Sequence, residues 1–319
     1  MKDSFGREIS YMRISVTDRC NMRCKYCMPE EGVKNLGHDK ILTFEEIARV
    51  VTAAAALGIT KYRITGGEPL ARKGIVSLVE SLAAIDGVRE LAMTTNGTML
   101  AQHAEALKKA GLQRVNISVD SLKYHKYEDI TRGGDLDAAF EGINAALKYG
   151  LTPLKLNVVA IKGFNDDEIL DFVQLTINHP INIRFIELMP VGRVSKDNDY
   201  RYLSVGEIKE KLPCLIPLDK REGVAELWRY PEAQGNIGFI SPMSNLFCGN
   251  CDKIRLTADG KLKPCLHTDE EIDLKDVLKT NDDGLLKKAI RNAVLRKGEK
   301  HLLNDGAKPV ERGMSQIGG

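Results

Sequence analysis

The sequence of 319 residues lacks any long apolar run and any excess of charge of one sign. No segment approaches the roughly 20 apolar residues that a membrane-spanning helix needs, and the first stretch, MKDSFGREISYMRIS, contains no apolar signal region. The net charge of +2, without a basic tail or stripe, argues against a nucleic-acid-binding surface. These absences predict a cytoplasmic protein that has neither a membrane nor a nucleic acid as its partner.

A disulfide framework is also not expected, because the cytoplasm keeps thiols reduced. Of the seven cysteines, Cys214 stands alone in KLPCLIP and is predicted to be a small buried hydrophobe. The other six form two groups of three, and clustered thiols in a reducing compartment indicate metal binding. The groups are Cys20, Cys24 and Cys27, then Cys248, Cys251 and Cys265.

Strand-like and helix-like segments alternate through the first part of the chain. Runs rich in Val, Ile and aromatic residues predict buried strands at 11–17, 62–65, 90–95, 114–120, 154–160 and 182–188. Helical segments between them, one opened by the capping box Thr43–Glu46, imply parallel strands with right-handed crossovers. The predicted fold is α/β, a partial six-stranded TIM-like barrel. The alternative, a doubly wound open sheet, lacks its glycine-rich fingerprint after the first strand.

The alternation stops after residue 188. A polar irregular stretch, a short helix at SVGEIKEKL and two short strands at AELWRY and IGFI follow, and a helical stretch is expected at roughly 274–296. We therefore predict two units: a barrel at 1–225 and a loop-rich region at 226–319 that holds the second cysteine group. The tail ERGMSQIGG, taken alone, predicts an extended and exposed end.

The first cysteine group has the spacing C-x3-C-x2-C and follows the first strand. A structural zinc site takes four ligands in a tetrahedron, so zinc with a fourth ligand from elsewhere stays open. A four-iron cluster normally takes four thiolates, so three thiolates leave one iron free to bind a substrate. A loop after the first strand lies at the mouth of the barrel where such folds place their chemistry.

This motif, with Tyr26 before its last cysteine and TGGEP at 65–69, resembles the signature of the radical S-adenosylmethionine (SAM) superfamily. The resemblance implies that the open iron chelates the amino and carboxylate groups of SAM. It further implies that the reduced cluster cleaves the sulfonium to yield a 5′-deoxyadenosyl radical. The residues that it implies in SAM contact are Tyr26, Gly67, Ser118 and Met189.

The second group has the spacing C-x2-C-x13-C, which a zinc-ribbon fragment could also show. A four-thiolate zinc site built from Cys24, Cys27, Cys248 and Cys251 would leave Cys20 and Cys265 unused. A second cluster with three thiolates uses all six cysteines and leaves a second open iron for a substrate atom.

Basic residues fall within strands that should be apolar. Arg13, Arg63, Lys155 and Arg184 lie in four different predicted strands, and a buried cation without a partner is costly. Each alone is compatible with an ion-paired or snorkelling side chain. Together they predict a cationic lumen for a polyanion, since arginine forks suit phosphate oxygens.

The combination of motifs resembles the GTP 3′,8-cyclase family of molybdenum cofactor biosynthesis, from about Arg7 to Gly319. The motifs are the two cysteine groups with SVTDRCN, RITGGEPL, TTNG, FIELMP and the Gly-Gly end. The resemblance implies two [4Fe-4S] clusters, SAM, and GTP as substrate. Hydrogen abstraction from C3′ and attack on C8 would give (8S)-3′,8-cyclo-7,8-dihydroguanosine 5′-triphosphate, which cyclic pyranopterin monophosphate synthase then rearranges.

By resemblance, the GTP site comprises Arg13, Arg63, Thr94, Lys155, Arg184, Lys253 and Arg255, and the catalytic set comprises Cys20, Cys24, Cys27 and Arg255. The family usually has Arg-x-Arg where this chain has Lys253-Ile254-Arg255, and lysine loses the bidentate fork. The tail, Gly318 and Gly319, is implied to reach the active site. An electron donor is required but not identified, and a homodimer stays open. The rival interpretations are another two-cluster radical SAM enzyme, such as a peptide maturase, and a zinc-dependent structural or nucleic-acid-binding module.

Overall fold

The computed structural model describes residues 1–33, 36–192 and 201–318. Its centre is a run of parallel strands in sequence order, which confirms the predicted α/β partial barrel. These strands are β1 (Tyr11–Ser15), β2 (Lys61–Thr65), β3 (Glu90–Thr95), β4 (Arg114–Ser118), β5 (Leu154–Lys162) and β6 (Ile181–Glu187). Each agrees with a predicted strand to within two residues at either end.

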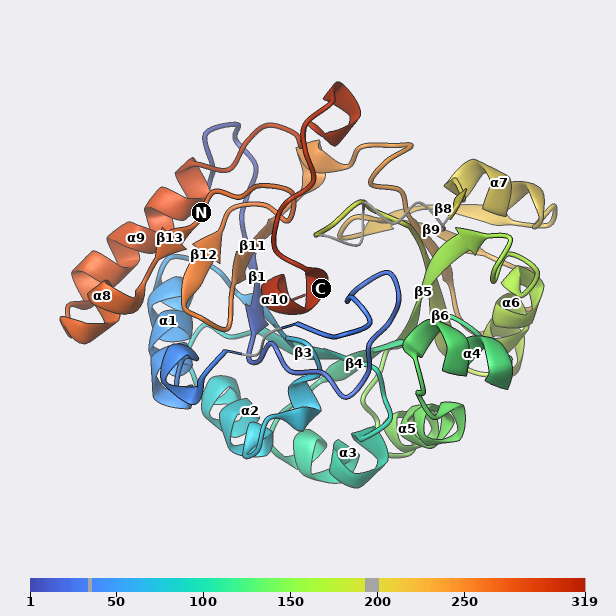
Figure 1. The fold of residues 1–319 in the computed structure, drawn as a ribbon, viewed down its shortest axis with the longest axis horizontal. Helices are drawn as coiled ribbons and strands as arrows, with labels where there is room; N and C mark the ends of the chain where they lie inside the picture. Colours follow the sequence, from blue (N-terminus) through green and yellow to red (C-terminus); the bar gives the residue numbers. More distant parts are fainter. Residues whose placement is uncertain (34–35, 193–200, 319) are drawn as a thin grey trace.

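Helices cover the outer face of the curved sheet (Figure 1). They are α1 (Phe44–Ala56), α2 (Ile75–Ala83), α3 (Leu100–Lys109), α4 (Tyr124–Thr131), α5 (Leu136–Lys148) and α6 (Ile169–Asn178). The predicted capping box is present at the start of α1, where Thr43 and Glu46 satisfy each other's backbone N–H groups. This arrangement leaves the inner face of the sheet free to line a lumen.

The sheet is wider than the six strands expected, because C-terminal strands add to both of its edges. Beyond β6 follow β10 (Ile237–Ile240), β9 (Ala225–Arg229) and β8 (Ile216–Glu222), and beyond β1 follow β11 (Lys253–Leu256), β12 (Lys261–Lys263) and β13 (Ile272–Asp273). In the described part of the chain, β10 and β11 run parallel to their inner neighbours. The predicted units 1–225 and 226–319 therefore share one sheet, and their division stays a prediction.

The remaining elements are short apart from one helix. β7 (Arg201–Tyr202) pairs with β5, and α7 (Val205–Glu210), α8 (Lys275–Lys279), α9 (Asp283–Leu295) and α10 (Met314–Ile317) complete the fold. The helix expected at 274–296 is divided into α8 and α9. Residues 193–200 of the predicted irregular stretch lie outside the described residues. Within the described ranges, none of the helices combines the length and apolar character needed to cross a bilayer.

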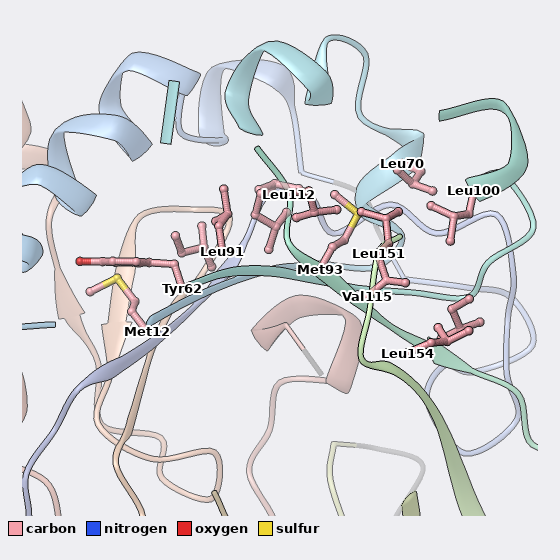
Figure 2. Close-up of a cluster of buried hydrophobic side chains, with 14 of the residues drawn as sticks. Met12, Tyr62, Leu70, Leu91, Met93, Leu100, Leu112, Val115, Leu151 and Leu154 are labelled. Atoms are coloured by element: carbon pink, nitrogen blue, oxygen red, sulfur yellow. The ribbon is translucent and has the colours of Figure 1, made fainter. Parts of the chain in front are cut away.

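The main core lies between the sheet and the outer helices (Figure 2). Because side chains alternate along a strand, Met12 and Ile14 of β1 point into this core while Arg13 between them points into the lumen. Tyr62 is fully buried in the core, and its hydroxyl donates to the Ile59 carbonyl oxygen at 2.8 Å. Burying each such side chain contributes roughly 1.5–3 kcal/mol, which fixes the strand register and hence the lumen face.

The C-terminal tail lies inside the curve of the sheet, where α10 and the chain end stand at the centre of Figure 1. Ile317 packs with Val191 and Val310 in a small apolar cluster separate from the main core. Ser315 and Ile317 are buried. The expectation of an extended, exposed tail is therefore wrong, because apolar contacts and the lumen cations hold it.

Candidate active site

One cavity of about 440 Å³ occupies the lumen, and every residue predicted for the site borders it. From the first cysteine loop and the strands β1 to β6 come Arg13, Cys20, Cys24, Tyr26, Cys27, Arg63, Gly67, Thr94, Ser118, Lys155, Arg184 and Met189. From the C-terminal region come Cys248, Cys251, Lys253, Arg255 and Cys265. The structure thus brings both cysteine groups and the cations to a single space; their individual roles stay predictions.

The loop carrying the first cysteine group is pressed against the end of β2. A Cβ atom at Gly67 would lie 2.3 Å from the Arg19 carbonyl oxygen, and one at Gly66 would lie 2.6 Å from that of Thr17. No side chain fits at these distances. The two glycines of TGGEP therefore serve contact between two chain segments, in addition to the ligand approach that the sequence suggested.

Glu68 of the same motif links its own turn to the end of β3. Its carboxylate accepts hydrogen bonds from Leu70 N at 3.0 Å, Thr95 Oγ1 at 2.8 Å and Asn96 N at 2.7 Å. Burial raises the pKa of Glu68 to about 7. Asn96 in turn donates to Asn21 Oδ1 at 2.8 Å, beside the first cysteine. Through Asn96, the motif thereby helps to hold the loop that carries the first cysteine group.

The first three thiols sit in a desolvated setting. Burial raises the pKa of Cys20 to about 11 and that of Cys27 to about 12, and it also raises the pKa of Cys24. Metal-bound cysteines are thiolates, so these thiols need a cationic group between them to ionise. No three His, Cys, Asp or Glu side chains of the described residues converge as a site for one metal ion. All three thiols border the lumen cavity, so a single bound group could contact all of them.

Tyr26 is held by a carboxylate that the sequence interpretation did not include. Its hydroxyl donates to Asp120 Oδ2 at 2.7 Å, while Val159 N donates to Asp120 Oδ1 at 2.8 Å. Burial raises the pKa of Asp120 to about 6, against the lowering effect of these two hydrogen bonds. Asp120 therefore orients the ring that precedes Cys27 on the cavity wall.

The second cysteine group is tied together by Lys297, which follows α9. Its ammonium donates to the carbonyl oxygens of Lys253 at 3.0 Å and Pro264 at 2.9 Å, which flank Cys251 and Cys265 in sequence. Burial favours the neutral thiol of Cys251, but Lys297 and then Lys253 outweigh it and lower the pKa. The group thus has a cationic neighbour that suits thiolate ligands.

Two histidines stand beside this group. The ring centroids of His267 and His301 are 4.8 Å apart, and His301 Nε2 lies 2.9 Å from the Pro242 carbonyl oxygen. Burial, followed by the charges of His301 and Arg255, lowers the pKa of His267 to about 3. His267 therefore borders the cavity as a neutral imidazole.

Strand register places three arginines, Arg13, Arg63 and Arg255, side by side on neighbouring strands. Arg13 pairs with Arg255 on one side and with Arg63 on the other. Burial, then Arg255 and Arg63, lower the pKa of Arg13. The Gly318 carbonyl oxygen accepts hydrogen bonds from Arg255 Nη1 at 2.7 Å and Arg13 Nε at 3.3 Å. The predicted arrival of the tail at these cations is seen for Gly318; Gly319 lies outside the described residues.

A second set of cations lines the side of β5 and β6. Burial, followed by the guanidinium groups of Arg114, Arg184 and Arg63, lowers the pKa of Lys155, whereas its ion pair with the Glu222 carboxylate favours the charged ammonium form. Burial lowers the pKa of Arg184 to about 10. Both side chains form ion pairs with Glu222 at the end of β8. Nearby, Thr94 Oγ1 and Arg63 Nε are buried without a hydrogen-bond partner in the described residues, so both are available to a ligand.

Sequence reasoning missed several residues that border the cavity: Glu68, Glu90, Arg114, Asn116, Asp120, Glu222 and Lys297. Arg114 was detectable, since alternation along β4 places residues 114, 116 and 118 on one face. Glu222 carried no such signal, because its strand is polar and exposed. The prediction that Cys214 is buried is wrong: it is exposed after α7.

Comparisons with known proteins identify two families along the chain. The radical SAM superfamily matches residues 14–176, and the family described as Molybdenum Cofactor Synthesis C matches residues 181–303. A curated relative from Alkaliphilus oremlandii, named GTP 3′,8-cyclase, is 52% identical over 321 residues and covers 100% of both chains. A GTP 3′,8-cyclase from Moorella thermoacetica is 50% identical over 326 residues, again with 100% coverage of both.

Solved structures agree on the fold. SuiB from Streptococcus suis, in a crystal structure bound to S-adenosylmethionine, has a TM-score of 0.64 at 16% identity, covering 96% of this chain and 76% of its own. HydG, a maturase of the [FeFe]-hydrogenase, has a TM-score of 0.50 at 17% identity, covering 65% and 49%. At such identities the likeness extends to the fold alone.

Proposed function

This chain belongs to the radical SAM superfamily and, within it, to the GTP 3′,8-cyclase family, and from this premise we propose that it cyclises GTP. The product is (8S)-3′,8-cyclo-7,8-dihydroguanosine 5′-triphosphate, in the first step of molybdenum cofactor biosynthesis. The observation that carries the proposal is one cavity bordered by two three-cysteine groups and by the cations Arg13, Arg63, Lys155, Arg184 and Arg255. Neither a peptide maturase nor a zinc module requires that set of cations.

The cofactors we propose are two [4Fe-4S] clusters and SAM. Cys20, Cys24 and Cys27 would hold one cluster, and Cys248, Cys251 and Cys265 the other. When bound, the first cluster and SAM supply a 5′-deoxyadenosyl radical. The residues nearest this cluster site that would contact SAM are Tyr26, Gly67, Ser118 and Met189, all of which border the cavity.

The chain's own contribution is to bind and orient the nucleotide. The buried guanidinium groups are desolvated and point into one space, so a triphosphate would gain charge-assisted hydrogen bonds there. Thr94 Oγ1 and Arg63 Nε offer unpaired polar atoms to the same ligand. The ammonium of Lys253 donates to Asp252 at 2.8 Å. Lys253 supplies a positive charge but cannot bind a phosphate through two parallel hydrogen bonds as an arginine can. Holding C3′ near the radical source within the lumen supplies the proximity that the reaction needs.

The same proposal covers the partners and the compartment. The product would pass to cyclic pyranopterin monophosphate synthase, and an electron donor must reduce the first cluster. The free cysteines and two clusters suit a reducing compartment, so we place the protein in the cytoplasm.

The test is an anaerobic incubation of the reconstituted protein with dithionite, SAM and GTP, followed by mass analysis of the nucleotides. We expect a cyclised product of the same mass as GTP but different retention, together with 5′-deoxyadenosine. Omitting SAM should abolish both. Formation of 5′-deoxyadenosine without a new nucleotide would leave superfamily membership intact and overturn the GTP assignment.

Metal analysis tests the two clusters separately. Roughly eight iron atoms and eight sulfides per chain are expected, four of each per cubane. Cys24→Ser and Cys251→Ser should each lower iron by about half, whereas Cys214→Ser, at an exposed cysteine outside both groups, should change nothing. Stoichiometric zinc with negligible iron would overturn both cluster assignments.

A further inference from the structure

Glu222 places a carboxylate against two of the lumen cations. Its Oε1 pairs with Lys155 Nζ and its Oε2 with Arg184 Nη2. The two cations are nearly inaccessible, with 5% and 4% of their side chains exposed, whereas the Glu222 side chain is 42% exposed. The carboxylate therefore reaches these buried charges from the solvent side.

The position of Glu222 is set by the β8–β9 hairpin at one edge of the sheet. Glu222 ends β8 and pairs with Ala225 of β9, with a register irregularity between Pro217 and Arg221. The next residue, Gly223, has a φ of +61, and a Cβ there would lie 3.6 Å from Lys253 Nζ on β11. The hairpin tip thus lies between the cations of β5 and β6 and the ammonium of Lys253 on β11.

Arg184 reaches the hairpin through a gap left by a glycine. A Cβ atom at Gly238 of β10 would lie 2.3 Å from Arg184 Nη1 and 2.6 Å from its Cδ. The guanidinium is directed across β10 toward Glu222 because no side chain stands in its path. Strand register places Gly238 directly beside Arg184.

We propose that the Glu222 carboxylate competes with the phosphates of the substrate for Lys155 and Arg184. It neutralises Lys155 and Arg184 when the lumen holds no nucleotide, and it leaves them when phosphate oxygens arrive, so that the hairpin tip moves. The proposal rests on the proposed GTP site. Two buried cations without an anion are costly, and a carboxylate on a partly exposed hairpin can be exchanged for a polyanion without breaking the core. Glu222 thereby favours ligands that carry several phosphates over ligands with one or none.

The test compares Glu222→Gln with Asp219→Asn, which removes one negative charge from an exposed position of the same strand. Binding to the anaerobic holoenzyme is measured by calorimetry with GTP, with inorganic tripolyphosphate and with guanosine. We expect Glu222→Gln to lower the Kd for GTP and for tripolyphosphate about tenfold. This is the factor expected if Glu222 leaves the two cations free in about a tenth of the unliganded molecules. Guanosine binding should stay unchanged, and Asp219→Asn should resemble the unaltered protein.

Glu222→Ala also removes any hydrogen bonds that the glutamine amide of the first variant could still make to the cations. It should likewise tighten the binding of GTP and tripolyphosphate. Equal or weaker tripolyphosphate binding in both Glu222 variants would overturn the proposal, since the carboxylate would then stay with the cations in the bound state. Tripolyphosphate contains no guanine, so its result does not depend on GTP being the substrate. Hydrogen exchange of the segment 216–229 should increase on binding tripolyphosphate, and an unchanged rate would also count against displacement.

Discussion

Arg255 donates a hydrogen bond from Nη1 to the carbonyl oxygen of Gly318 at 2.7 Å, so a strand in the barrel wall holds the end of the described chain. Arg13 Nε lies 3.3 Å from the same oxygen. Gly318 has a φ of +73, and a Cβ there would lie 2.4 Å from Thr65 Oγ1. The tail is therefore packed against the strands of the barrel. Its position depends on both arginines and on glycine at position 318, where a larger residue would not fit.

Replacing Arg255 by alanine should uncouple SAM cleavage from GTP turnover. The change removes one buried guanidinium from the GTP site and one bond to the tail, but leaves the first cysteine group untouched. Hydrogen bonds of charged groups contribute about 1.5–3 kcal/mol, so GTP turnover should fall at least tenfold while 5′-deoxyadenosine formation continues. Arg291→Ala, at an exposed position of α9, is the control. Normal GTP turnover in the Arg255 variant would remove that residue from the site.

Adding one methyl group at Gly318 should displace the tail. The left-handed backbone costs a non-glycine residue about 1–2 kcal/mol, and the methyl group would also overlap Thr65 Oγ1. Gly306→Ala separates the two effects, because Gly306 has a φ of +86 and nothing within 4 Å of its Cβ position. We expect Gly318→Ala to lower GTP turnover more than tenfold and Gly306→Ala to lower only the melting temperature. Equal turnover in the two variants would mean that the tail's fit does not matter.

Local patterns account for most of what the sequence could predict. The six inner strands bury one face against the outer helices and therefore carry apolar residues at the positions that face the core, and the first cysteine group and TGGEP are contiguous motifs. Arg13 and Arg63 could be placed in the lumen because each interrupts such a run. Every one of these signals depends on residues that are close together in the chain.

The features that escaped prediction depend on contacts between distant segments. Nothing in KIRL indicates that β11 pairs with β1, although this pairing puts Arg255 beside Arg13. Glu222 lies in a polar strand, so its partners on β5 and β6 are visible only in three dimensions. The tail looked exposed because its composition is polar, whereas the lumen cations and a small apolar cluster hold it inside.

Arg312 should anchor the tail independently of pH in the neutral range. It donates to both carboxylate oxygens of Asp259, at 3.1 and 2.9 Å, and to Glu271 at 2.9 Å. Burial acts to raise the pKa of Asp259, but the hydrogen bonds from Arg312 and Thr257 and the charge of Arg312 together outweigh it and lower the pKa. A carboxylate with a lowered pKa contributes stability above its ordinary pKa, near 4, and loses it only as the pH falls further. Docking of the tail through this pair should therefore be constant between pH 6 and 9.

Arg312→Ala should release the tail throughout that range. Thermolysin digestion followed by mass analysis should show faster loss of the last residues in this variant at every pH. Arg296→Ala, which breaks an exposed pair with Glu270, should digest like the unaltered protein, since exposed pairs contribute about 0–1 kcal/mol. A tail that becomes protease-sensitive between pH 6 and 9 in the unaltered protein would contradict the assignment of this anchor.

Lys297 should be required for the second cysteine group, although it is no part of either cysteine motif. Lys297→Met keeps most of the volume of a side chain that is 3% exposed but removes its bonds to the carbonyl oxygens of Lys253 and Pro264. Each buried acceptor left unpaired costs about 1–3 kcal/mol, so the segments that carry Cys251 and Cys265 should separate. We expect iron to fall from roughly eight to roughly four atoms per chain, while SAM cleavage at the first group is retained. Lys300→Met, which removes an exposed pair with Asp305, should keep all its iron, and full iron in both variants would show that the cysteines need no such support.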